Sequence, residues 1–528
     1  MSGDAVVVGA GPNGLAAAIT LAEAGRRVTV LEAADHPGGA VRTEELTLPG
    51  FHHDTYSAVY PAAAASPVFA RFELERHGLR WIHPGACYAH VLDEGRAGAL
   101  YRSLDETAAA LEQLHPGDGE AWRRFAAPYL EHFGAVRDTM LAGFPPVGGP
   151  TRLVARLGLG GVLGFARLVL MPADALGREL FADPGARAWL YGSAMHGDTP
   201  PRAAGSAVAA AYLNFLGHAV GWPSPEGGAG RLADALVGRL RELGGEVRTG
   251  ARVTRLAVER GRVTGAQTAD GDRVSAGIVV ATVMPHALLA LCDGSLPERY
   301  VRALGRYRYG PATVKVDWAL DGPIPWASEH ARRAGTVHVG GDADEVVHAT
   351  QVHDHAPERP FLLLGQQSLA DPSRAPAGQH TAWAYTHGPR ESGWADDLPA
   401  VAERIEAQVE RFAPGFRDRI LARRVVGPRE LQARNANLVG GDVGGGSYGL
   451  DQVVFRPAPS LSPYRTPIRG LTLGSAAAFP GGAVHGVPGH AAARVALAED
   501  RMPLLGGLPA LPALPGLPSL PGLRRPRC

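Results

Sequence analysis

Cysteine and lysine are scarce in this chain of 528 residues. The three cysteines, Cys87, Cys292 and Cys528, are scattered and form no C-x-x-C pair. The sequence therefore predicts neither a disulfide framework nor a cysteine-rich metal site, and it disfavours a disulfide reductase. Lysine occurs once, at Lys315, so arginine is the ordinary cation of this chain and an arginine alone indicates little.

The chain also lacks an excess of either charge, since 52 basic residues face 52 acidic ones. Nucleic-acid-binding proteins normally carry a positive patch or stripe, so we expect no nucleic-acid partner. The N-terminus enters an apolar run by residue 5, which leaves no room for a signal peptide. No run of about 18 uncharged apolar residues is present, so we expect no membrane span and a cytoplasmic protein.

Two segments are unusual in composition. Residues 153–171 are apolar but are interrupted by Arg156 and Arg167. We expect a buried or lid helix there; the alternatives are a monotopic membrane-contact helix, which would associate the protein with a membrane, and an apolar substrate entrance. Residues 503–528 repeat Leu-Pro with the period of polyproline II, so we expect a disordered, non-globular tail, with docking to a partner as the alternative.

The first residues predict a βαβ unit. Residues 4–8 form an apolar strand, and residues 12–24 form a helix with Pro12 in its first turn and Gly25 as its stop. Residues 27–31 form the next apolar strand.

A G-x-G-x-x-G motif joins the first strand to the helix. Gly9 allows the tight turn, Gly11 lets the backbone approach a pyrophosphate, and Gly14 allows close packing of the helix on the strand. The helix N-terminus then presents free N–H groups and its positive dipole end to the phosphate. Glu32, at the end of the second strand, suits an unphosphorylated ribose, which disfavours NADP and leaves NAD or FAD.

A glycine pair and a basic residue follow Glu32, at Gly38, Gly39 and Arg42. With them, the stretch GAGPNGLAAAITLAEAG…VTVLEAADHPGGAVRT resembles the FAD-binding signature of the amine oxidase and phytoene desaturase superfamily. The resemblance implies that FAD is the cofactor and that Gly38, Gly39 and Arg42 cradle its pyrophosphate.

The far end of the chain agrees with this resemblance. Residues 470–493, GLTLGSAAAFPGGAVHGVPGHAAA, are similar to the family's C-terminal flavin segment, in which a helix N-terminus faces the isoalloxazine and the pyrophosphate. Ser475 stands where many relatives have an acid, so the contact made by that acid is not predicted here. Val253 matches the position whose backbone contacts adenine. The implied cofactor-binding residues are Gly9, Gly11, Pro12, Asn13, Gly14, Glu32, Ala33, Gly38, Gly39, Arg42, Val253, Gly474, Gly482, Val484, His485 and Gly486.

The phytoene-dehydrogenase-like branch, which includes the pyridine-nucleotide-disulfide-oxidoreductase-domain-containing proteins, is the most similar, and the resemblance covers nearly the whole chain apart from the tail. It implies an α/β fold with a discontinuous, Rossmann-type FAD-binding domain and an α+β substrate domain with a helical lid. The FAD-binding domain would consist of residues 1–70, 226–290 and 420–500, and the substrate domain of residues 71–225 and 291–419.

Lys315 and His485 are the candidate catalytic residues. In ATVKVDWAL, strand alternation places Lys315 and Asp317 on one face. The segment resembles the amine oxidase strand whose lysine holds a water against flavin N5; the alternative is a pair with Asp317 or a solvated side chain. His485 could approach the flavin ring and stabilise its reduced form, or it could pack at the start of a helix.

Four further residues are candidates for the substrate cavity: Tyr56, Tyr385, His387 and Asn437. Asp442, in a glycine-rich loop, could lie near the flavin or form a turn. His52, His53 and Asp54 lack a second cluster of ligands, so we expect no metal site.

The resemblance implies an enzyme, an FAD-dependent oxidoreductase that transfers a hydride from a largely apolar small molecule to flavin N5, with O2 or a quinone as electron acceptor. Three alternatives stay open: a flavin amine oxidase that uses Lys315, an FAD-dependent polyene isomerase, and a non-catalytic lipid-binding escort protein of the same fold. Amine oxidases normally have an aromatic pair beside the flavin, which the sequence does not reveal. The intact Glu32, Gly38, Gly39, Arg42 and 481–486 loop disfavour the escort protein.

Overall fold

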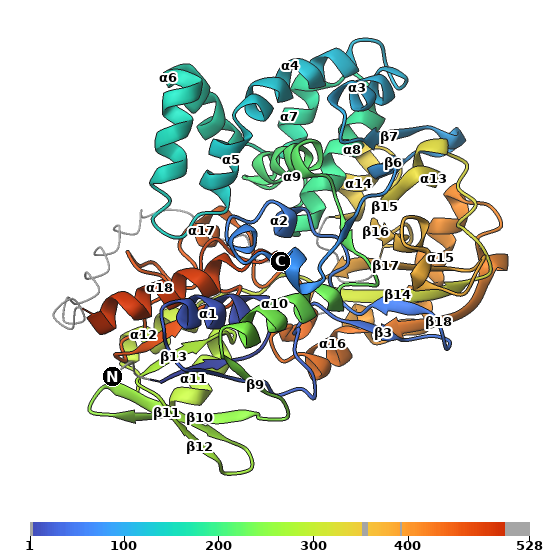
Figure 1. The fold of residues 1–528 in the computed structure, drawn as a ribbon. Coiled ribbons are helices and arrows are strands. Elements are labelled where there is room, and N and C mark those ends of the chain that lie inside the picture. The colour runs from blue at the N-terminus through green and yellow to red at the C-terminus, as the bar shows by residue number, and fades with distance from the viewer. Residues whose placement is uncertain (1–3, 351–356, 391–392, 502–528) are drawn as a thin grey trace, which may run out of the picture.

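The computed structural model describes residues 4–350, 357–390 and 393–501, and most of its strands belong to two sheets (Figure 1). The first sheet has the strand order β19-β13-β1-β2-β9, and all its neighbouring strands are parallel. Its central strands are short apolar runs, AVVV in β1 and IVVA in β13, as parallel strands covered on both faces require. The strands are β1 (Ala5–Val8), β2 (Val28–Leu31), β9 (Glu246–Arg248), β13 (Ile278–Ala281) and β19 (Leu471–Leu473).

Both faces of this sheet are covered, and the side chains of β1 alternate between them. Ala5 and Val7 pack against helices α1, α10 and α18, whereas Val6 and Val8 pack against α11 and a small antiparallel sheet (Figure 1). These elements are α1 (Pro12–Glu23), α10 (Gly230–Glu242), α11 (Pro285–Cys292), α18 (Val487–Arg501), β10 (Val253–Glu259), β11 (Arg262–Thr268) and β12 (Arg273–Ser275).

The second sheet has seven strands in the order β18-β14-β17-β16-β15-β6-β7. All its neighbours are antiparallel except β15 and β6. One face packs on α15 and α13; the other, here called the inner face, packs on the helical layer. The elements are β6 (Ala86–Val91), β7 (Ala97–Leu100), β14 (Ala312–Leu320), β15 (Ala334–Val339), β16 (Leu362–Gly365), β17 (His380–Gly388), β18 (Ile420–Val426), α13 (Glu329–Arg333) and α15 (Leu398–Phe412).

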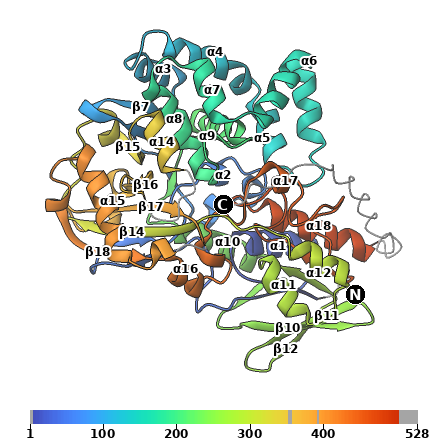
Figure 2. The ribbon, with the colours of Figure 1, turned by 180° about the vertical axis from the view of Figure 1, so that it is seen from behind.

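The helical layer lies above the inner face, with α9 buried at its centre (Figure 1). Helix α6 projects from this layer in both ribbon views and is interrupted at Gly158, whose φ is 67° (Figure 2). The helices are α3 (Leu104–Glu112), α4 (Asp118–Glu131), α5 (Phe133–Met140), α6 (Gly148–Leu170), α7 (Ala173–Leu180), α8 (Pro184–Ala194) and α9 (Ser206–Val220).

Short elements connect these layers. They are β3 (Thr43–Glu45), β4 (His52–Asp54), α2 (Pro61–Ala64), β5 (Trp81–Ile82), β8 (Ser224–Pro225), α12 (Glu298–Leu304), α14 (Ala343–Ala349), α16 (Pro428–Arg434) and α17 (Leu450–Val453).

The expected α/β fold with a parallel Rossmann-type sheet is confirmed, and its strands come from three separated parts of the chain. One predicted boundary needs correction. The segment 420–500 was expected to belong to the FAD-binding domain, but β18, at its start, pairs with β14 in the second sheet. The third segment of the FAD-binding domain therefore begins after β18. The predicted tail, residues 503–528, lies outside the described residues.

Helix α6 corrects one further expectation. The segment 153–171 was expected to be a buried or a lid helix; only 17% of its apolar window is buried, so the buried alternative is wrong. By length and composition α6 is also able to cross a membrane, the one such helix among the described residues. The sequence criterion missed it because Arg152, Arg156 and Arg167 interrupt the apolar run.

Candidate functional site

The glycine motif forms a tight turn between β1 and α1. Gly9 has a φ of +98°, and a methyl group added to Gly14 would overlap the carbonyl oxygen of Gly9. Gly11 is the N-cap of α1, and no side chain caps the helix. The first N–H groups of α1 are therefore available to a bound anion, and the helix dipole favours negative charge there.

Glu32 directly follows β2 and lies beside this turn. Its carboxylate accepts hydrogen bonds from the N–H of Ala10 at 2.6 Å and the N–H of Ala34 at 2.9 Å. The N–H of Ala251 donates to the carbonyl of Glu32 at 2.7 Å, which brings the start of β10, at Val253, next to the end of β2. The predicted ribose and adenine positions thus lie side by side.

The second glycine pair meets the first loop. The N–H of Gly38 donates to the carbonyl of Ala10 at 2.9 Å, and a methyl group on Gly39 would lie 3.0 Å from Cα of Gly11. Arg42 lies with Nη2 2.7 Å from Oε1 of Glu44, while its buried Nε has no partner among the residues described.

The C-terminal segment completes this arrangement. The N–H of Gly474 donates to the carbonyl of Ala281 at 2.9 Å, which continues the parallel sheet. A methyl group on Gly489 would overlap the carbonyl oxygen of Asn13, so the first turns of α18 and α1 touch. Gly486, with a φ of +71°, leads into α18.

His485 stabilises this loop through hydrogen bonds between its ring and the backbone. Its Nδ1 accepts from the N–H of Val487 at 3.2 Å, so Nε2 carries the proton and donates to the carbonyl of Gly482 at 3.0 Å. Burial lowers the pKa of His485 to about 4, so the ring is neutral at pH 7. Both ring nitrogens are engaged with the backbone. This geometry favours the helix-start alternative over proton transfer, and a catalytic role of His485 stays a prediction.

These residues fit FAD. Two helix N-termini and two glycine loops converge, and Asn13 Oδ1 and Arg42 Nε are buried polar atoms without partners within the described ranges. A pyrophosphate would meet N–H donors, two positive dipole ends and a guanidinium, while Glu32 would accept hydrogen bonds from the ribose.

Lys315 lies in a buried charged cluster on the inner face. Its Nζ pairs with Asp317 and donates to the carbonyl of Asp54 at 3.1 Å. Arg374 lies 2.5 Å from the Asp54 carboxylate, and burial, with Lys315 next, lowers the pKa of His53 to about 3. Two cations thus face two carboxylates around a neutral imidazole. Lys315 thus makes the ion pair with Asp317 that was one of the two alternatives for it. Its role in holding a water against the flavin stays a prediction.

The four substrate candidates are spread over two regions. Tyr385 and His387 lie on the inner face of β17, with ring centroids 5.0 Å apart. Asn437 links loops, because its side chain accepts from the N–H of Met284 and donates to the carbonyl of Thr282. Tyr56 packs with Val426, Leu431 and Leu438, and Val426 is in register with Lys315. Tyr385 and His387 are the two candidates whose rings are in contact.

Two residues that the sequence did not single out are prominent. Asp198 lies 2.7 Å from His387, and Arg456 is fully buried between the rings of Tyr307 and Tyr448. Arg456 donates to the hydroxyl of Tyr307 at 2.9 Å. No motif marks either residue, and arginine is too common in this chain to attract notice.

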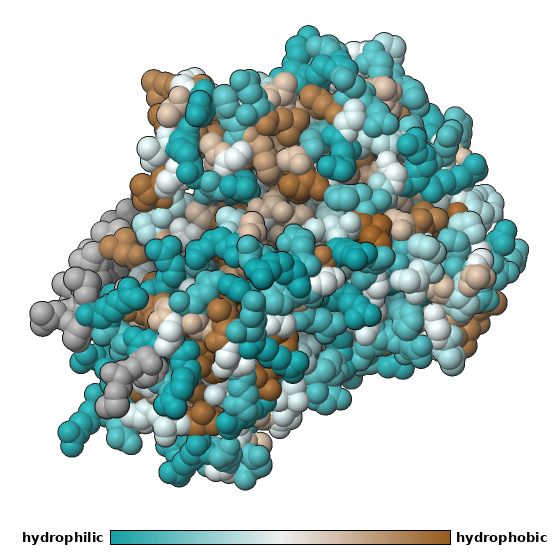
Figure 3. All heavy atoms as spheres, in the orientation of Figure 1, coloured by the Kyte–Doolittle hydropathy of each residue, from teal (hydrophilic) through white to brown (hydrophobic). Residues whose placement is uncertain are grey.

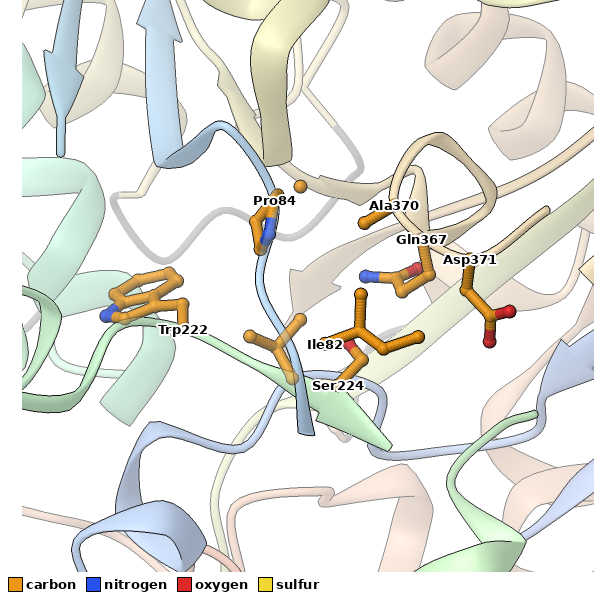
Figure 4. A pocket seen from close by; sticks show the side chains of 9 residues that line it. Ile82, Pro84, Trp222, Ser224, Gln367, Ala370 and Asp371 are labelled. Carbon is orange, nitrogen blue, oxygen red and sulfur yellow. The ribbon is translucent and has the colours of Figure 1, made fainter. Parts of the chain in front are cut away.

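A small pocket opens between β5, β8 and the segment around Gln367 (Figure 4). Figure 4 shows the Trp222 ring on one side of it and the Asp371 carboxylate on the other. None of the sequence-predicted site residues lines it. Its lining residues are Val59, Ile82, Pro84, Trp222, Ser224, Gly335, Gln367, Ala370 and Asp371.

Comparison with known proteins gives consistent matches. The profile described as flavin containing amine oxidoreductase matches residues 13–496. The chain is 28% identical over 93% of both chains to pyridine nucleotide-disulfide oxidoreductase domain-containing protein 2 of Mus musculus. It is 26% identical to a lycopene-forming phytoene desaturase of Pseudescherichia vulneris, over 93% of this chain and 98% of that one. An oxidoreductase from Methanosarcina mazei shares the fold, with a TM-score of 0.63 and 17% identity over 93% of this chain and 99% of that one.

Proposed function

Because this chain belongs to the flavin-containing amine oxidoreductase family and is an FAD-dependent oxidoreductase, we propose that it dehydrogenates a largely apolar small molecule. The observation that supports an apolar substrate is the aromatic character of the inner face. Trp383 stacks on Tyr385 at 5.8 Å between ring centroids, and Tyr88 packs on Trp222 at 5.0 Å. The desaturase named above is a relative that spans nearly the same length.

Different parts of the chain would bind the cofactor and the substrate. The glycine loops at Gly11 and Gly39, with the N-termini of α1 and α18, would bind the pyrophosphate. When bound, FAD supplies the acceptor for a hydride that leaves a substrate carbon. The inner face would orient the substrate and exclude water, and O2 or a quinone would take the electrons afterwards.

The test is anaerobic bleaching of the FAD-loaded protein with three probes: a cyclic monoterpene alkene, a linear polyene and an aliphatic amine. We expect an alkene or the polyene to bleach the flavin and the product to gain a double bond, and O2 or a quinone analogue to restore the colour. Bleaching by the amine alone would replace the proposal with amine oxidation. A polyene that changes geometry without net oxidation would indicate an isomerase, and protein that cannot be loaded with FAD would indicate the escort alternative.

We also propose that α6 attaches the protein to a membrane surface. Its exposed side includes Leu159 at 75% exposure and Leu163 at 63%, with Val147, Val154 and Leu170 also exposed. Figure 3 shows apolar surface at the upper left, where Figure 1 places α6. The helix contains three arginines and no acidic residue. Arg152 pairs with Asp138 and Arg167 with Glu179, so Arg156 is the arginine whose charge would complement anionic headgroups.

Vesicle flotation tests this attachment. We expect the protein to float with vesicles that contain phosphatidylserine, and the double variant Leu159→Glu, Leu163→Glu to stay behind. The matched control is Leu421→Glu, which places the same charge at an exposed leucine of β18. Equal flotation of wild type and the double variant would refute the proposal.

A further inference from the structure

His387 occupies a polar position on the inner face, near the C-terminal end of β17. It pairs in register with Thr313 of β14, so both side chains lie on the same face. Nδ1 of His387 lies 3.1 Å from the hydroxyl of Thr313, and Nε2 lies 2.7 Å from Oδ1 of Asp198. A hydroxyl can donate to Nδ1 or accept from it, so both the neutral and the charged imidazole have a partner.

Asp198 has a left-handed backbone conformation at the point where it contacts His387. It follows the short helical turn Met195–Gly197 and has a φ of 50°, a left-handed conformation that a non-glycine residue rarely adopts. Strain of this kind persists where the surrounding structure enforces it, commonly at functional sites. Its side chain is only 7% exposed.

The pair is connected to the loop that the family resemblance assigns to the flavin. Oδ2 of Asp198 lies 2.5 Å from the position that a Cβ on Gly444 would take. A methyl group on Gly482 would in turn overlap the carbonyl oxygen of Gly444. The carboxylate of Asp198 and the backbone at Gly444 therefore lie between His387 and the 482–486 loop.

The charges around His387 favour its protonated form. Burial lowers its pKa, but Asp198 and then Asp442 raise it, so that the pKa lies above its usual value of 6.5. His196 also faces the ring and is neutral, because burial lowers its pKa to about 3. The phenol of Tyr385 completes the surroundings and is uncharged, since burial raises its pKa. Every other histidine of the described residues with a shifted pKa has it lowered, as in His338 and His485.

The two candidate catalytic residues are already engaged. Lys315 is paired with Asp317, and the ring of His485 is bonded to backbone at both nitrogens. At His387, Nε2 is buried 2.7 Å from a carboxylate without an aligned hydrogen bond. His53 also has a buried Nδ1 near a carboxylate, 3.7 Å from Asp317, but its pKa is lowered to about 3, whereas that of His387 is raised. His387 is therefore the better placed of these groups to accept a proton.

We propose that His387, held by Asp198, accepts the proton released when the substrate is oxidised. The inference rests on the proposed function. The substrate loses a hydride from one atom and a proton from its neighbour, and a double bond forms between the two. The two electrons leave with the hydride to bound FAD, and the proton moves to the neutral imidazole of His387. Asp198 is a positioning residue that stabilises the resulting imidazolium.

The first test needs no substrate. In FAD-loaded protein with isotope-labelled histidine, an NMR titration should show an imidazole signal that is absent from His387→Gln and that titrates with a pKa above 6.5. In Asp198→Asn the same signal should titrate about one pH unit lower. A His387 pKa at or below 6.5 in wild type, or an unchanged pKa in Asp198→Asn, would overturn the proposal even if no probe compound reduces the flavin.

The second test uses whichever probe bleaches wild type. The rate of flavin reduction should rise with pH as His387 loses its proton, and Asp198→Asn should shift that rise to lower pH. His387→Gln should slow reduction by about 100-fold and abolish the pH dependence, while the dissociation constant of the probe changes by less than about twofold. The control is His380→Gln, a histidine of the same strand that hydrogen-bonds Ser368 outside the pair. Equal rates in His387→Gln and wild type would reject His387 while leaving the proposed function intact.

Discussion

Gly11 is the N-cap of α1 and Gly14 lies in the first turn of that helix, yet added methyl groups would meet different surroundings. At Gly11 the nearest atom would be Cα of Gly39 at 3.9 Å, an ordinary contact. We therefore expect Gly11→Ala to fold normally but to bind FAD at least about tenfold more weakly, because the methyl group occupies the approach of the pyrophosphate. Titration of FAD-free protein with FAD, followed by fluorescence, measures the affinity.

Gly14→Ala is the contrasting variant. Its methyl group would overlap the carbonyl oxygen of Gly9, so the strand and helix have to separate. We expect a lower melting temperature of the FAD-free protein, whereas Gly11→Ala melts like wild type. If Gly11→Ala kept wild-type affinity for FAD, the phosphate would not lie against this glycine.

At the scale of elements, β14 carries two different faces. Val314, Val316 and Trp318 pack against the apolar cluster that includes α15, while Lys315 and Asp317 point to the inner face. In Lys315→Met the carboxylate of Asp317 stays buried without its cation. The free energy of unfolding, measured in urea, should therefore be lower by about 3–5 kcal/mol. The double variant Lys315→Met, Asp317→Asn should recover part of this loss.

The same variant tests the catalytic prediction for Lys315. If the lysine holds a water at the flavin, Lys315→Met slows flavin reduction or reoxidation in the fraction that folds. Unchanged rates would leave Lys315 with a structural role in the strand. Lys315→Arg keeps the charge and serves as the control for stability.

At the scale of the whole molecule, buried neutral histidines make the fold sensitive to acid. Burial lowers the pKa of His53 to about 3 and those of His90 and His485 to about 4, against an ordinary value of 6.5. The unfolded chain therefore binds more protons than the folded one below pH 6.5. The contribution of these neutral rings to the free energy of unfolding is fully present well above pH 6.5. Below pH 6.5, each histidine lowers the free energy of unfolding by up to about 1.4 kcal/mol for each pH unit.

Urea unfolding at pH 7.5, 6.0 and 5.0 measures this loss. We expect the midpoint to be lower at pH 6.0 than at pH 7.5 and to fall clearly further by pH 5.0. His90→Gln, which can still donate to the carbonyl of Gly341, should reduce the acid-dependent fall relative to wild type. A midpoint that does not change between pH 7.5 and 5.0 would contradict the neutral state of these rings.

The sequence by itself determined that the chain begins with a dinucleotide-binding βαβ unit, because the signals of that unit are local. Gly9, Gly11, Gly14 and Glu32 lie within one βαβ unit, where backbone geometry dictates which residue fits each position. The family resemblance then linked this unit to the glycine loop before α18. The same resemblance implied the α/β fold with its Rossmann-type sheet.

Only the tertiary structure decided which distant side chains meet. Asp198 and His387 are far apart in the chain, and they form a pair because strand register and the turn after Gly197 bring them together. The exposure of α6 and the pairing of β18 likewise depend on what packs against them, and a local apolar pattern looks the same whether or not a neighbour covers it. Burial and contact, which show Lys315 paired with Asp317 and His485 bonded to backbone, are properties of the folded chain.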